Sequence, residues 1–183
     1  MPNYRRGYVH RGTYFITQVT YRRERWLCTE SSRQALRAAI SHTQQKHPFV
    51  VEAFVLLPEH WHGLLRLPEG DGDISMRMRL IKAYVTRHYG AALGIDRTIS
   101  ESRRKRKEQN LWQRRFYEHL IRDERDFETH CDYLHYNPVK HGLCQSPQDW
   151  PFSTVHNFIK RGIYPPDWGR DINPDIPHSV WDR

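Results

Sequence analysis

The segment Phe49–Leu67, FVVEAFVLLPEHWHGLLRL, carries the clearest strand pattern in the sequence. Phe49–Leu57 is an apolar run of strand length, and His60–Leu67 is a second strand-like run directly after it. Only Pro58 and Glu59 separate the two runs, and a two-residue connection is typical of a β-hairpin. The segment therefore predicts two antiparallel strands that lie side by side.

The sequence on either side of this hairpin alternates between strand and helix patterns. Thr13–Thr20 is rich in β-branched and aromatic residues, which favours a strand, and Phe116–Arg122 is a further candidate strand. Apolar residues recur at helical spacing in Leu36–Thr43 and in Ile74–Ala92, and Asp123–Asn137 is a third candidate helix. The order β-α-β-β-α-β-α predicts an α+β fold with a ferredoxin-like antiparallel sheet and helices packed on it.

Local signals predict where two of these helices begin and end. Ser31 opens a capping-box pattern, so we expect the first helix to start there and to stop near Pro48. Asp123 is a candidate N-cap for the last helix. We expect that helix to end at Asn137, because a proline disfavours helical conformation in the residue before it and Pro138 follows.

Length and composition indicate one domain. The 183 residues are close to the ~150 residues of an average domain, so we expect a single domain over residues 1–183. We expect residues of about 95–110 to form an exposed basic loop and the proline-rich residues of about 140–183 to wrap irregularly on the body. No stretch approaches the ~20 apolar residues of a membrane span, and no signal peptide opens the chain. Three cysteines without CxxC spacing argue against a disulfide framework and a cysteine-based zinc site, which indicates a reducing compartment. We expect a cytoplasmic, nucleoid-associated protein.

The charge balance favours a polyanionic partner. Lysine and arginine number 29 against 21 acidic residues, which gives a net charge of +8. Arginines interleave with aromatic residues near the start of the chain, a pattern that suits the phosphates and stacked bases of single-stranded nucleic acid. A solvated face and a mobile loop are the alternative interpretation of such charge runs. The candidate DNA-binding residues are Tyr4, Arg5, Arg6, Arg11, Arg103, Arg104, Lys105, Arg106 and Lys107.

The triplet His60-Trp61-His62 is the sharpest local signal for chemistry. Side chains alternate between the two faces of a strand, so His60 and His62 point the same way and Trp61 points the other way. Neighbours on one face lie ~6–7 Å apart along a strand, close enough for two imidazoles to bind one metal ion. With twelve histidines in the chain, an H-x-H triplet can also be incidental, and both interpretations stay open at this point.

The last helix brings a tyrosine and an amide onto one stripe. Each residue of a helix is rotated by 100° about the helix axis from the one before it. With the core-facing Leu134 set at 0°, Asn137 lies at about −60° and Tyr133 at about −100°, so both border the core. Tyr136 falls near 200° and is expected to point away from the core. A helix packed on the sheet could thus present Tyr133 and Asn137 together to a metal ion. The alternative is that the tyrosines are ordinary amphipathic residues.

A tyrosine in this position could act as a nucleophile. An unperturbed phenol has a pKa near ~10, so it needs a nearby cation to ionise at neutral pH. A metal ion held by His60 and His62 would supply that charge and polarise a phosphate oxygen. The other histidines near this part of the sequence are expected to be structural: His119, His130 and His141.

The sequence resembles the REP-associated tyrosine transposases, a branch of the single-tyrosine HUH transposases. The motifs that carry the resemblance span most of the chain: Tyr4-Arg5-Arg6, Leu57-Pro58-Glu59-His60-Trp61-His62, Leu67-Pro68-Glu69-Gly70-Asp71, Trp112-Gln113, Arg115-Phe116, Asp132-Tyr133, Asn137-Pro138-Val139-Lys140-His141-Gly142, Trp150-Pro151-Phe152-Ser153-Thr154 and Tyr164-Pro165-x-Asp167-Trp168. The resemblance implies an RRM-like sheet in an HUH endonuclease architecture. It also implies that His60 and His62 are metal ligands, Asn137 is the third ligand and Tyr133 is the nucleophile. One departure is the region 95–110, which is longer than the resemblance predicts.

The resemblance further implies a reaction and a substrate. Tyr133 would attack a phosphate of single-stranded DNA, leaving a 5′-phosphotyrosine link and a free 3′-hydroxyl that can later rejoin strands. The cofactor would be a divalent metal ion, Mg²⁺ or Mn²⁺, with zinc as an alternative. The partner would be single-stranded DNA with a REP hairpin, and no membrane or protein partner is expected. Two other functions stay open: a non-catalytic RNA- or DNA-binding module, and a metal-dependent nuclease that uses water.

Overall fold

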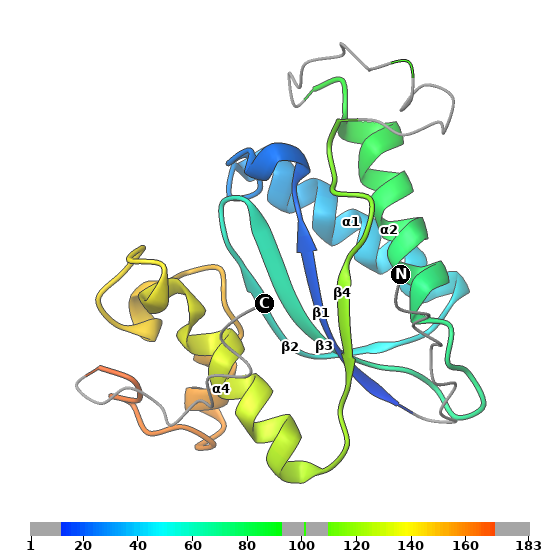
Figure 1. The fold of residues 1–183 in the computed structure, drawn as a ribbon. Coiled ribbons are helices and arrows are strands. Elements are labelled where there is room, and N and C mark those ends of the chain that lie inside the picture. The colour runs from blue at the N-terminus through cyan, green and yellow to red at the C-terminus, as the bar shows by residue number, and fades with distance from the viewer. Residues whose placement is uncertain (1–11, 93–100, 102–109, 171–183) are drawn as a thin grey trace.

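The computed structural model describes residues 12–92, 101 and 110–170, and its centre is a four-stranded sheet (Figure 1). The strands lie in the order β2-β3-β1-β4, and every neighbouring pair is antiparallel. This order, with its β-α-β-β-α-β succession, confirms the predicted ferredoxin-like fold. The elements are β1 (Thr13–Val19), the 3-10 helix η1 (Tyr21–Arg23), α1 (Glu30–Lys46), β2 (Val50–Leu56), β3 (His60–Arg66), α2 (Ile74–Tyr89), β4 (Tyr117–Leu120), α4 (Glu124–Lys140), the 3-10 helix η2 (Pro147–Asp149) and α5 (Val155–Lys160).

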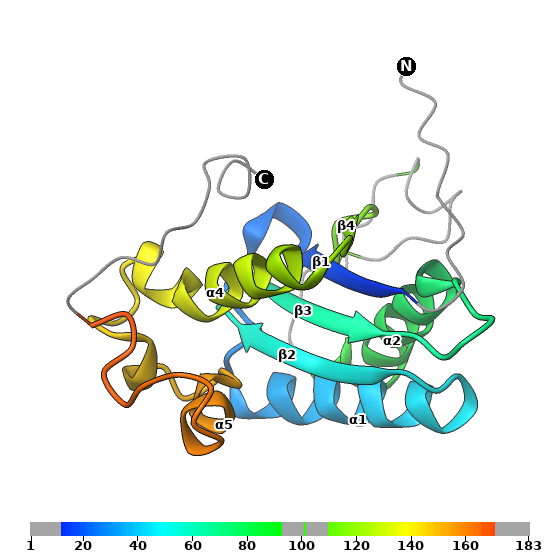
Figure 2. The ribbon, with the colours of Figure 1, turned by 90° about the horizontal axis from the view of Figure 1, so that it is seen from below.

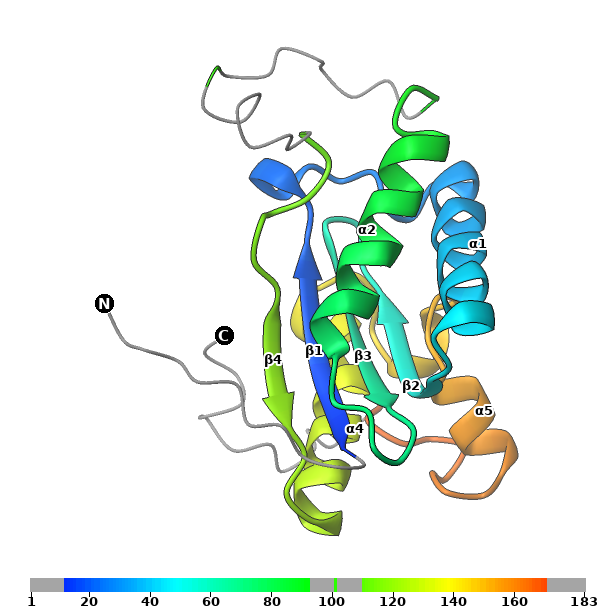
Figure 3. The ribbon, with the colours of Figure 1, turned by 90° about the vertical axis from the view of Figure 1, so that its right-hand side faces the viewer.

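Helices cover both faces of the sheet: α1 and α2 lie on one face and α4 lies on the other (Figures 2 and 3). Side chains alternate along β3, so Trp61 and Leu65 pack in the core beneath α1 and α2. Leu64 packs on the opposite face in the core beneath α4, and His60 and His62 share that face. The prediction that the two histidines point the same way is therefore confirmed.

The backbone of β3 is fixed on both sides, because β3 is an inner strand of the sheet. His62 is paired with Thr17 of β1 on one side and with Val55 of β2 on the other. The predicted hairpin between β2 and β3 is present, and a hydrogen bond from the Leu57 amide to the His60 carbonyl closes it at 2.8 Å. An inner strand with a closed hairpin at one end is a rigid support for side chains that must hold a precise geometry.

The helix starts follow local capping, with one difference from the sequence prediction. Helix α1 is capped by Thr29, whose side-chain oxygen accepts a hydrogen bond from the Ser32 amide, so the predicted cap at Ser31 is wrong. Ser31 lies inside the first turn, because Thr29 has the extended backbone that an N-cap needs. Asp123 caps α4 as predicted and accepts a hydrogen bond from the Asp126 amide at 2.8 Å.

Helix α4 continues past the predicted end at Asn137 and includes Pro138. The last turn survives because its carbonyls still find donors: the His141 amide donates to Asn137 and the Leu143 amide donates to Pro138. The prediction that Tyr136 points away from the core is also wrong. Tyr136 is buried, because the chain after α4 returns over that side of the helix.

The chain after α4 packs against that helix and along the free edge of β2. Tyr164 stacks on Trp168 with ring centroids 4.1 Å apart, and the Tyr164 hydroxyl donates to Asp132 at 2.7 Å. The same hydroxyl lies 3.2 Å from Nδ1 of the fully buried His135. These contacts fix the outer side of α4, which carries Tyr133 on its inner side. Among the described residues, every helix is too short or too polar to span a bilayer.

Candidate active site

Two buried histidines of β3 lie side by side beneath α4. The rings of His60 and His62 have centroids 4.8 Å apart, and their residues are only 4% and 1% exposed. Burying two imidazoles against an apolar core costs free energy unless they have partners. Their partners therefore indicate what this part of the molecule is built to do.

One nitrogen of each ring is engaged by a neighbour that orients it. His60 Nδ1 lies 3.2 Å from Oε1 of Glu59, and His62 Nδ1 lies 2.8 Å from Oγ1 of Thr17. A carboxylate accepts only, so the proton of His60 sits on Nδ1 and leaves a lone pair on Nε2. His62 Nε2 is buried and has no hydrogen-bond partner among the described residues. Histidines oriented through one nitrogen, with the other directed into the site, are typical of metal ligands.

Asn137 completes this group from α4. Its Oδ1 lies 3.4 Å from His60 Nε2, and its Nδ2 is buried without a partner among the described residues. His60 Nε2, with its lone pair, and Asn137 Oδ1 are then two hydrogen-bond acceptors that face each other. This arrangement is unfavourable unless a cation lies between them. Two imidazole nitrogens and an amide oxygen are a donor set that fits a divalent metal ion. The residues that sequence and resemblance singled out as ligands are thus brought together by the fold.

Tyr133 lies next to the histidines on the same helix as Asn137. The Tyr133 and His62 rings have centroids 5.2 Å apart at an angle of 71°. Burial raises the pKa of the Tyr133 phenol, and a hydrogen bond with Asn137 acts in the opposite direction. The exposed Lys140 places its Nζ 5.5 Å from the centre of the Tyr133 ring. Tyr133 therefore lies beside the histidine pair, and its raised pKa favours the neutral phenol.

Burial favours the neutral form of the His62 imidazole. Burial lowers the pKa of His62 well below its ordinary value, and the neighbouring imidazoles of His60 and His141 act in the same direction. The Glu59 carboxyl has a lowered pKa, mainly through its hydrogen bond with His60. Neutral imidazole is the form that binds metal ions, so the site is prepared for a cation rather than for an extra proton.

Two residues of the site were missed by the sequence reasoning. Thr17 reaches His62 only through the register between β1 and β3, which no local pattern in the sequence contains. His141 was expected to be structural, yet it is exposed and its ring lies 5.1 Å from the His60 ring. Its position directly after the last turn of α4, one turn beyond Asn137, was the available signal.

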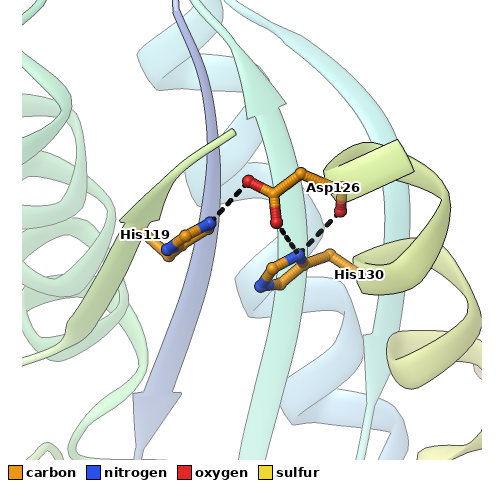
Figure 4. Close-up of side chains that lie close together, drawn as sticks. All are labelled: His119, Asp126 and His130. Carbon is orange, nitrogen blue, oxygen red and sulfur yellow. Dashed lines mark hydrogen bonds and ion pairs between the residues drawn. The ribbon is translucent and has the colours of Figure 1, made fainter. Parts of the chain in front are cut away.

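A second cluster of possible ligands lies between β4 and α4 (Figure 4). Ligand atoms of His119, Asp126 and His130 lie within 4.8 Å of one another, so this group could also hold a metal ion. His119 Nε2 lies 2.8 Å from Asp126 Oδ2, and His130 Nδ1 lies 2.8 Å from the Asp126 carbonyl oxygen.

The geometry of this second cluster favours a hydrogen-bond network. The His119 and His130 rings are stacked 4.5 Å apart at 14°, and one nitrogen of each ring is already engaged by Asp126. Asp126 also accepts from Arg122 Nε at 3.0 Å. Burial acts to raise the pKa of Asp126, but hydrogen bonds from Arg122 and His119 outweigh it and hold that pKa well below its ordinary value. This carboxylate is therefore already satisfied by protein donors.

The predicted DNA-binding residues cannot be placed. All of them lie outside the described residues, as does most of the predicted basic loop at about 95–110: Tyr4, Arg5, Arg6, Arg11, Arg103, Arg104, Lys105, Arg106 and Lys107.

Comparison with known proteins identifies the family. Residues 8–137 match the model of the family described as "Transposase IS200 like". The REP-associated tyrosine transposase of Escherichia coli (strain K12) is 42% identical over 172 residues, covering 94% of this chain and 93% of that protein. A Haemophilus influenzae relative is 41% identical over 176 residues, covering 96% and 97%. A solved structure of a REP-associated tyrosine transposase bound to a REP hairpin superposes with a TM-score of 0.75 at 43% identity, covering 92% of this chain and 91% of that one. The chain therefore belongs to the IS200-like transposase family and, within it, to the REP-associated single-tyrosine transposases.

Proposed function

We propose that residues 1–183 act as one transposase domain that cleaves and rejoins single-stranded DNA at REP hairpins through a link to Tyr133. The observation that carries the proposal is the meeting of His60, His62 and Asn137 with Tyr133 beneath α4. A phenol beside two imidazole nitrogens and an amide oxygen that can hold a metal ion has the parts required for attack on a phosphodiester. The hairpin substrate is supported by the relative whose structure was solved with a REP hairpin.

His60, His62 and Asn137 would hold the divalent metal ion, which we propose to be Mg²⁺ or Mn²⁺. When bound, the ion supplies positive charge to a phosphate oxygen and so favours the charge that develops during attack. Mn²⁺ accepts imidazole more readily than Mg²⁺ does, whereas the amide oxygen suits either ion. Glu59 and Thr17 keep the two rings oriented so that both Nε2 atoms stay directed into the site.

Tyr133 supplies the oxygen that attacks. The bond from its Oη to phosphorus forms, the bond from phosphorus to the 3′-oxygen breaks, and that oxygen takes up a proton to become a 3′-hydroxyl. The phenol proton leaves to solvent, and the positive charge of Lys140 near the ring favours the phenolate that remains. One phosphodiester is exchanged for another, so a 3′-hydroxyl can attack the tyrosyl link and rejoin the strand without an outside energy source.

We propose that this chemistry takes place in the cell interior near the chromosome, where REP hairpins would be available as single strands. The charge of +8 supports such a polyanionic partner. We propose that the basic residues near the start of the chain and at 103–107 contact this DNA.

A denaturing protein gel tests the function. The protein is incubated with labelled single-stranded REP DNA and Mn²⁺, and the gel separates free protein from protein joined to DNA. We expect a slower, labelled band that is absent in Tyr133→Phe. Tyr136→Phe is the matched control, because it removes the same hydroxyl from the side of α4 turned away from His62.

The same experiment separates the alternatives. Cleavage that survives Tyr133→Phe and leaves no adduct would show a nuclease that uses water. Retention of the DNA without cleavage by the unaltered protein would show a binding module. Either result contradicts the tyrosine mechanism.

A further inference from the structure

A groove of about 530 Å³ lies on the face of the molecule opposite to the histidine pair. One wall is the outer side of α1, the floor is β2, and the other wall is formed by residues 151–154. These residues are held on the free edge of β2, because the Leu56 amide donates to the Phe152 carbonyl and the Thr154 amide donates to the Phe54 carbonyl, both at 2.9 Å. The groove is therefore bounded by hydrogen-bonded elements rather than by loose side chains.

Two arginines of α1 give the groove a positive charge. Arg33 and Arg37 lie one helical turn apart on the same side of α1, and the residues that line the groove include no aspartate or glutamate. Like charges at this spacing destabilise a helix unless an anion lies between them. Among the described residues, neither arginine has an acidic partner. An anion in the groove would relieve this repulsion.

Arg33 is fixed in place before any ligand arrives. Its Nη1 donates to the Cys28 carbonyl at 2.7 Å, and its guanidinium lies over the Phe152 ring, 4.5 Å from the centroid. A guanidinium that is already ordered loses little entropy when it binds an oxyanion. Arg37 is exposed one turn further along and can approach the same anion.

The rest of the lining combines apolar residues with the polar side chains of Ser41, Gln44, Ser153 and Thr154. Leu36 and Ile40 of α1 face Phe54 of β2 across the groove, next to the two arginines. Pockets for single small ligands have volumes of about 300–1,000 Å³, a range that includes this groove. Apolar side chains beside two guanidinium groups match the two parts of a nucleotide, a base and a phosphate.

We propose that this groove binds one unpaired nucleotide of the DNA substrate, with its phosphate on Arg33 and Arg37 and its base against Leu36, Ile40 and Phe54. The proposal rests on the function proposed above. It adds a binding site that is separated from the cleavage chemistry by the thickness of the sheet. The groove thus contributes to holding the DNA and takes no part in attack on the phosphate.

The salt dependence of DNA binding tests the phosphate contact. A single-stranded phosphate contact contributes about 0.7 to the slope of log affinity against log salt concentration. We expect Arg37→Ala to reduce the magnitude of this slope by about 0.7 and to weaken binding of the REP oligonucleotide at low salt. Arg79→Ala, which removes an exposed arginine from α2, is the matched control and should leave both quantities unchanged. Adduct formation should stay normal in Arg79→Ala.

The base contact is tested with abasic sites placed one at a time at the unpaired positions of the oligonucleotide. Loss of a stacked base weakens binding by about fivefold or more. With the unaltered protein, we expect an abasic site at one position to weaken DNA binding by this amount. With Ile40→Ala, an abasic site at the same position should weaken binding much less. If the unaltered protein binds and forms the Tyr133 adduct but Arg37→Ala keeps the full slope, the groove proposal is overturned while the proposed function stands. If the unaltered protein forms no adduct, it is the proposed function that fails.

Discussion

Replacing Thr17 with valine tests whether His62 is held as a metal ligand. The Thr17 hydroxyl lies 2.8 Å from His62 Nδ1, and His62 is only 1% exposed, so no water can easily take its place. Valine has nearly the same shape and removes only this contact. The change leaves His62 with the same ring in the same core but without the partner that fixes its orientation and tautomer.

The expected loss of metal affinity follows from the role of the hydrogen bond that orients His62. Removing an outer partner of a ligating histidine costs about 10- to 100-fold in metal affinity or activity. The free energy of unfolding without metal should fall by about 1–3 kcal/mol, the cost of leaving one buried hydrogen-bonding group unpaired. A purely structural histidine would show the stability loss alone.

Isothermal titration with Mn²⁺ measures the affinity, and urea unfolding without metal measures the stability. Thr13→Val, at the start of the same strand, is the matched control and should bind Mn²⁺ as the unaltered protein does. Mn²⁺ affinity and cleavage rate within twofold of the unaltered protein in Thr17→Val would refute the assignment of His62 as an oriented ligand.

Three further predictions follow from the same geometry. His62→Ala should abolish cleavage in the gel assay and leave hairpin affinity nearly unchanged; a parallel loss of affinity would instead indicate a folding role. Because burial raises the pKa of Tyr133 and only the phenolate attacks, the single-turnover cleavage rate should rise with pH from about 6 to about 9, and a flat profile would contradict this. Tyr164→Phe removes the hydroxyl shared by Asp132 and His135, so urea unfolding should show a loss of about 1–3 kcal/mol, whereas an unchanged midpoint would show that this hydroxyl contributes nothing.

The sequence was sufficient to predict which side chains share a face wherever one local pattern determines this. Alternation along β3 predicts that His60 and His62 share a face, and the phase of α4 predicts that Tyr133 and Asn137 share a stripe. Both relations hold in the structure. The β-α-β-β-α-β order places α1 and α2 on one face of the sheet, so α4 is left to cover the opposite face. The ligand and nucleophile roles of these four residues remain predictions.

The relations that the sequence could not supply depend on contacts between distant segments. Thr17 and His62 meet only because of the register between β1 and β3. Tyr136 is buried by Trp168, 32 positions later, so the phase of the helix alone assigned it wrongly to solvent. Pro138 fits inside α4 because later amides satisfy the nearby carbonyls, which a rule about neighbouring residues does not include.

The location of bound Mn²⁺ tests the central claim most directly. Crystals of the protein grown with Mn²⁺ and measured for anomalous scattering would reveal the ion independently of any assay. We expect one strong peak between His60 Nε2, His62 Nε2 and the Asn137 side-chain oxygen, next to the Tyr133 hydroxyl. A peak at His119, Asp126 and His130 with none at the histidine pair of β3 would contradict the account.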